Sequence, residues 1–121
     1  MEKWQAEIRL KFKRVPWRIK VGFSYEWKAW LIAYDLLGMG PEEFGKIDVD
    51  KQLSALAFGA ASWYRLKQGK NVFFTPEDIE TALLNASKAD NMEIINAMKY
   101  AQFPPWLKQG TDTADKKKEK I

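Results

Sequence analysis

The chain has 121 residues, of which 46% are hydrophobic and 30% are charged, and its formal net charge is +4. This length and composition are those of one globular domain, large enough to bury a core without disulfide bonds. The chain contains no cysteine and no histidine, which excludes Ser-His-Asp and Cys-His catalytic groups and zinc sites built on those residues. An enzyme would have to work with Asp, Glu, Lys or Tyr alone, and this alternative ranks last. We expect a protein that is not an enzyme and has no cofactor.

The first part of the chain predicts a β-hairpin over residues 4–23. Apolar and polar residues alternate in WQAEIRLKF and again in PWRIKVGF, which is the pattern of two half-buried strands. The predicted inner rows are Trp4, Ala6, Ile8, Leu10 and Phe12 on the first strand, and Trp17, Ile19, Val21 and Phe23 on the second. The rest of the chain is expected to cover these rows, because an isolated hairpin is marginally stable in water.

A strongly apolar helix is expected next, at about residues 25–37, with Ser24 as its N-cap. One apolar stripe of this helix consists of Trp27, Trp30, Leu31, Tyr34 and Leu37, and a second of Tyr25, Ala29, Ile32 and Leu36. Two interpretations remain open for this helix. Either both stripes are buried inside the domain, or one of them binds another protein.

Three further helices are expected, at about residues 50–67, 76–88 and 92–102. Glycines and Pro41 predict a loop over residues 38–49, with room for one helical turn after the proline. Small residues in ALAFGAAS should let a neighbouring helix approach closely, and Thr75 with Asp78 has the spacing of a capping box. A break is expected at Ala89-Asp90-Asn91. The globular domain should span residues 1–108, followed by a disordered polar tail at 109–121.

Basic and aromatic residues interleave in RLKFKRVPWRIK, as they do in surfaces that bind single-stranded nucleic acids. The alternation, however, predicts the basic side chains on one face of the hairpin and the aromatic ones on the other. Nucleic-acid binding by this hairpin is therefore an alternative function rather than the expected one. The acids of PEDIE are typical of a helix N-terminus and do not indicate a metal site. No apolar run is long enough for a membrane span or a signal peptide.

The order of these elements, together with three short motifs, resembles the tail assembly chaperones of long-tailed (siphovirus-like) bacteriophages. The motifs that carry the likeness are Val21-Gly22-Phe23, Leu56-Ala57-Phe58-Gly59-Ala60 and Thr75-Pro76-Glu77-Asp78-Ile79. The likeness is one of pattern and covers roughly residues 8–102. It implies an α+β fold that is mostly helical, with the N-terminal hairpin packed on about four helices.

The resemblance also implies a function. Such chaperones bind and shield the tape-measure protein in the host cytoplasm and assist assembly of the tail-tube protein around it. Self-association is also expected, whereas a membrane partner is not. An exposed apolar groove would suit this role, because it can cover the apolar face of a client helix. The residues expected to bind the partner are Tyr25, Ile32, Leu36, Phe58, Phe73 and Phe74.

Overall fold

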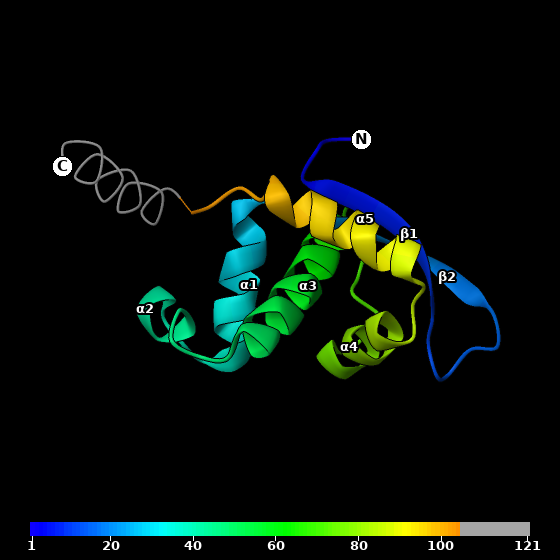
Figure 1. Cartoon of the computed structure of the whole chain (residues 1–121), viewed down its shortest axis with the longest axis horizontal. Helices are drawn as coiled ribbons and strands as arrows, with labels where there is room; N and C mark the ends of the chain where they lie inside the picture. Colours follow the sequence, from blue (N-terminus) through cyan, green and yellow to red (C-terminus); the bar gives the residue numbers. More distant parts are fainter. Residues whose placement is uncertain (105–121) are drawn as a thin grey trace.

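The protein folds as a mostly helical α+β domain, here seen in a computed structural model that describes residues 1–104 (Figure 1). The predicted fold class is confirmed. The predicted end of the domain at residue 108 and the predicted disordered tail at 109–121 lie outside the described residues. In chain order the elements are β1 (Gln5–Lys11), β2 (Arg18–Ser24), α1 (Trp27–Leu37), α2 (Pro41–Phe44), α3 (Val49–Leu66), α4 (Pro76–Leu84) and α5 (Lys88–Lys99).

β1 and β2 form the predicted antiparallel hairpin, with Ile8 opposite Val21 and Ala6 opposite Phe23. All four of these side chains are buried, because α3 packs against β2 and α5 packs against β1. Figure 1 shows α5 running alongside β1. The inner row is shorter than predicted: Trp17 is 62% exposed at the tip of the hairpin, before β2 begins.

The far end of β2 is buried on both faces. Gly22 and Ser24 point away from the inner row, yet both are buried. Gly22 has no side chain there because a Cβ atom would lie 2.2 Å from the ring of Tyr64 on α3. The glycine therefore lets a helix residue pack directly on the strand backbone.

α1 and α3 approach each other at the distance that small residues allow. A Cβ atom on Gly59 would lie 2.2 Å from the backbone oxygen of Ala29. Ala29, Ala33 and Ala60 are buried in the same core. The close approach predicted from ALAFGAAS is confirmed, and it fixes α1 as the partner helix.

The predicted N-cap of α1 is wrong. Ser24 is the last residue of β2, and the N-cap is Glu26, whose side chain makes no capping hydrogen bond. The Ser24 hydroxyl instead donates to the Glu26 carboxylate at 2.6 Å. Burial of both faces of the strand end pulls this serine into the sheet, so it is not free to cap a helix.

The capping box of α4 is confirmed. The backbone N–H of Asp78 donates to the Thr75 hydroxyl at 3.1 Å, and the backbone N–H of Thr75 donates to the Asp78 carboxylate at 2.9 Å. The helical turn predicted after Pro41 is also present, as α2.

The predicted break at Ala89-Asp90-Asn91 is wrong, because α4 ends at Leu84 and α5 begins at Lys88. Ser87 is the N-cap of α5 and accepts a hydrogen bond from the backbone N–H of Asp90 at 3.1 Å. The side-chain amide of Asn91 donates to the carbonyls of Leu83 and Ser87. The break between the helices thus lies earlier in the chain than predicted, because Ser87 caps α5. Asn91, which was predicted to lie in the break, is inside α5 and links it to the end of α4.

Candidate protein-binding groove

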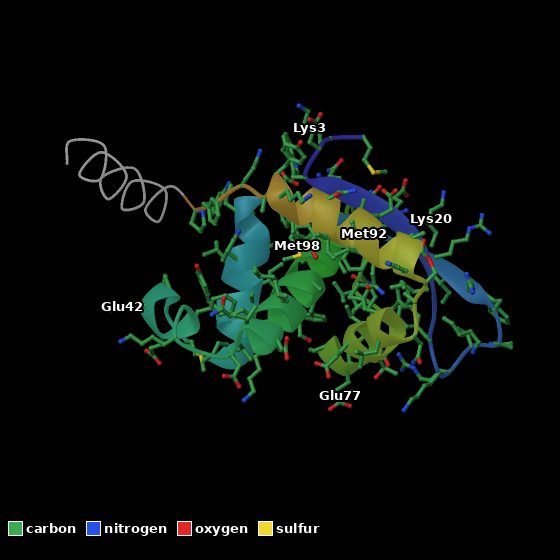
Figure 2. All side chains as sticks on the ribbon, in the orientation of Figure 1. Lys3, Lys20, Glu42, Glu77, Met92 and Met98 are labelled. Atoms are coloured by element: carbon green, nitrogen blue, oxygen red, sulfur yellow. The ribbon has the colours of Figure 1, made fainter. Side chains whose placement is uncertain are left out.

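An apolar groove of about 370 Å³ lies between α3, α4 and α5. It forms because α4 packs against α3 whereas α5 packs against β1, so these two helices diverge from each other. Each helix contributes residues at helical spacing, so that one face of each lines the groove. Its lining residues are Tyr25, Leu53, Ser54, Ala57, Glu80, Leu83, Leu84, Asn91, Ile94, Ile95 and Met98. Figure 2 labels Met98 on α5, beside α3.

Large apolar side chains in the groove remain open to solvent. Leu53 on α3 is 41% exposed, Leu84 on α4 is 78% exposed and Ile95 on α5 is 46% exposed. The row on α5 runs from Asn91 to Met98, which is about 10 Å at 1.5 Å per residue. A groove of this length and polarity matches about two turns of an amphipathic helix.

The charge at the groove is acidic. Glu80 is the one charged residue among its lining residues, and its carboxylate accepts a hydrogen bond from the Ser54 hydroxyl at 2.7 Å. Residues 75–104, which include α4 and α5, carry five acidic side chains and two lysines, a net charge of −3. A partner with a basic residue beside its apolar stripe would complement this arrangement.

Tyr25 lies at the floor of the groove and is 1% exposed. Its backbone is engaged on both sides: its N–H donates to the carbonyl of Trp4, and its carbonyl accepts from the N–H of Gln102, each at 2.8 Å. Its hydroxyl has no hydrogen-bond partner within residues 1–104. Burial raises the pKa of Tyr25, so the hydroxyl keeps its proton and can donate a hydrogen bond.

The two apolar stripes of α1 are partly covered by other elements of the same chain. Trp30 and Tyr34 of its first stripe contact Phe44 of α2, with ring centroids 6.2 and 5.2 Å apart. The second stripe faces α3 through Ala29. Of the predicted partner-binding residues on this helix, Ile32 is half-buried and Leu36 is 38% exposed.

Phe58, Phe73 and Phe74 lie together, but they pack against their own chain. The Phe58 and Phe74 rings meet edge to face at 6.1 Å, and Phe12 of the hairpin stacks on Phe74 at 6.3 Å. Phe74 is buried and Phe58 is half-buried. Phe73 is 43% exposed, and the guanidinium of Arg65 lies 4.7 Å from its ring centroid.

The six residues predicted to bind a partner are thus divided among three places: the groove floor, α1 and the phenylalanine cluster. Only Tyr25 lines the groove. The walls of the groove, which include Leu84 and Ile95, are absent from the predicted residues. Each follows another large apolar residue, Leu83 or Ile94, and these adjacent pairs were the available signal for a wider apolar face.

Within the described part of the chain, no cluster of acidic side chains could hold a metal ion. Residues 1–104 also include no helix long and apolar enough to cross a lipid bilayer. Comparison of the chain with protein-family models, with curated proteins and with solved structures gives no match in any of the three.

Proposed function

We propose that this protein is a phage tail assembly chaperone that binds and shields the tape-measure protein in the host cytoplasm and assists assembly of the tail tube. The observation that carries the proposal is the groove between α3, α4 and α5, where Leu53, Leu84 and Ile95 are exposed side by side. The order of elements on which the sequence resemblance depends supports it as well. The role is one of binding and requires no catalytic group.

The proposed occupant of the groove is an amphipathic helical segment of the tape-measure protein. Its apolar stripe would cover the exposed leucine and isoleucine side chains, which lowers the apolar area in contact with water for both partners. A basic residue next to that stripe would face Glu80. A long helical protein with repeated apolar stripes aggregates when these are uncovered, so covering them until the tube subunits arrive is a chaperone function.

The direct test uses a tape-measure protein encoded in the same genome as the client. The tape-measure protein of the same genome is co-expressed with the tagged chaperone, and co-purification and client solubility are measured. The groove variant is Leu84→Ser with Ile95→Ser. We expect it to reduce recovery of the client about tenfold or more, because both residues are central and apolar.

A matched control comes from α1, where Leu31 and Leu36 are 37% and 38% exposed but lie outside the groove. Leu31→Ser with Leu36→Ser likewise replaces two exposed aliphatic side chains with serine and should leave recovery of the client unchanged. If the α1 variant abolishes binding and the groove variant does not, the groove is the wrong surface. If the wild-type protein neither binds the client nor keeps it soluble, the chaperone function is wrong.

A further inference from the structure

The face of the hairpin that points away from the inner row carries two pairs of like charges. In the strand register Arg9 lies opposite Lys20, and Lys11 lies opposite Arg18. All four residues are exposed. We call these four residues the cationic face. They alternate with the inner row, so their side chains share one side of the sheet.

Little within the described chain neutralises this charge. Residues 8–25 contain six basic side chains and no acid. Arg14 at the tip pairs with Asp78 at 2.7 Å, and the ammonium of Lys11 donates to the carbonyls of Phe12 and Val15. Within residues 1–104, the side chains of Arg9, Arg18 and Lys20 make no hydrogen bond or ion pair. Glu7 and Asp90 border the face without pairing with it.

Such an arrangement destabilises the isolated hairpin. Like charges directly opposite each other repel, whereas opposite charges at the same positions would stabilise the pair. Charged side chains, lysine above all, protect exposed strands from aggregation, but this does not require two like-charged pairs directly opposite each other. Four cations of one sign therefore point to a polyanionic ligand. Residues two apart on a strand are about 6.6 Å apart, which suits successive phosphates of an extended nucleic-acid strand.

An aromatic side chain stands beside these cations. Trp17 directly precedes Arg18 and is 62% exposed. The sequence pattern places this ring in the inner row, away from the basic residues, and that placement was the argument against nucleic-acid binding. The structure places it in the connection between β1 and β2, at the tip of the hairpin. Figure 1 shows the tip of the hairpin at one end of the described part of the chain. Cations and an exposed ring on adjoining surfaces are what a single-stranded nucleic acid requires, because phosphates bind the former and a base stacks on the latter.

We infer that the cationic face and Trp17 form a binding site for single-stranded nucleic acid, in addition to the proposed chaperone function and independent of it. Phosphates contact Arg9, Arg18 and Lys20, and one base stacks on the indole ring. The backbone and ring contacts carry no base-specific hydrogen bonds. The site therefore binds with little sequence preference and with strong dependence on salt.

The test measures binding of the full chain to a labelled oligothymidylate of about 20 nucleotides, by fluorescence anisotropy, at several salt concentrations. Neutralising about three phosphates predicts a slope of log affinity against log salt of about −2. Arg18→Gln with Lys20→Gln should reduce the size of this slope by about 1.4. The control is Lys46→Gln with Lys51→Gln, which changes the net charge by the same amount. Lys46 lies between α2 and α3, Lys51 lies in the first turn of α3, and both are exposed. This control should leave the slope unchanged.

Trp17→Ala separates stacking from charge. It should weaken binding about tenfold and leave the salt slope unchanged, because the ring contributes stacking and no charge. Tryptophan fluorescence of the wild-type protein should fall on binding, and this change should be smaller in the variant. Circular dichroism verifies that each variant is folded.

Three outcomes would overturn the inference. If the Arg18→Gln, Lys20→Gln variant and the Lys46→Gln, Lys51→Gln control lose affinity equally, the effect is a general one of net charge. Binding unaffected by Trp17→Ala, and matched by heparin, would show attraction to any polyanion. Tighter binding of polyglutamate or of vesicles rich in phosphatidylserine, measured in the same assay, would assign the face to an acidic protein or to a membrane surface.

Discussion

The two sides of α3 differ in how closely they are packed. Toward α1, the helix presents Gly59 and Ala60, and the two backbones come so near that no side chain fits between them. Toward α4 and α5, it presents Leu53 and Ala57 to an open groove. The closed side uses small residues and stabilises the domain. The open side uses large apolar residues that the described chain leaves uncovered. Stability of the domain therefore explains the choice of residues on the closed side but not on the open side.

The largest effect is expected on the closed side, for Gly59→Ala. The added methyl group would lie 2.2 Å from the backbone oxygen of Ala29, and a backbone atom cannot move aside as a flexible side chain can. We expect a loss of about 2 kcal/mol in the free energy of unfolding, even though alanine favours a helix over glycine by roughly 0.5–1 kcal/mol. Urea denaturation measures this change.

Gly45→Ala serves as the control for that variant. Its added Cβ atom would lie 3.6 Å from the nearest backbone oxygens, which is ordinary contact, and the residue has right-handed helical backbone angles. Stability should stay the same or rise by up to about 1 kcal/mol. Equal losses in the two variants would mean that the α1–α3 contact is less tight than the structure shows.

A smaller effect is expected at Glu26, which ties the start of α1 to the end of α3. Its carboxylate accepts hydrogen bonds from Lys67 at 2.7 Å, from Ser24 at 2.6 Å and from Trp63 at 3.0 Å. Partial burial acts to raise the pKa of Glu26, but the hydrogen bonds and the charge of Lys67 outweigh burial, so this pKa is lowered. A quarter of the side chain is exposed, and solvent therefore screens part of the interaction.

A lowered pKa makes the contribution of Glu26 depend on pH. The stabilisation is present above the pKa of the unfolded state, roughly 4.3, and is lost as the pH falls through the lower pKa of the folded state. Glu26→Gln should reduce the free energy of unfolding by about 1 kcal/mol at pH 7, and the difference from wild type should shrink between about pH 5 and pH 3. Asp35→Asn, at an exposed acid on α1, is the control and should show no such convergence. A difference that is constant with pH would contradict the assignment.

The contrast between the two sides of α3 also explains what the sequence could predict. The hairpin, the helices and the capping box follow from local patterns. The small residues of ALAFGAAS predict a close helix contact but not which helix makes it. Local patterns do not give the direction of α5, which packs on β1 and leaves a space beside α3. Nor do they show that Phe44 of α2 contacts Trp30 and so covers part of the first stripe of α1. Leu84 and Ile95 become neighbours only through this tertiary arrangement.

The smallest change in stability, and the one of opposite sign, is expected on the open side for Tyr25→Phe. The wild-type hydroxyl is buried with no partner within residues 1–104, and an unpaired buried polar group is unfavourable. Its removal should leave the free energy of unfolding unchanged or raise it by up to about 1 kcal/mol. The same variant should bind the tape-measure protein as the wild type does, because the hydroxyl is buried and closed to a helix bound in the groove. Lower stability would show that the hydroxyl has a partner in the core, and weaker binding would show that the groove opens to expose it.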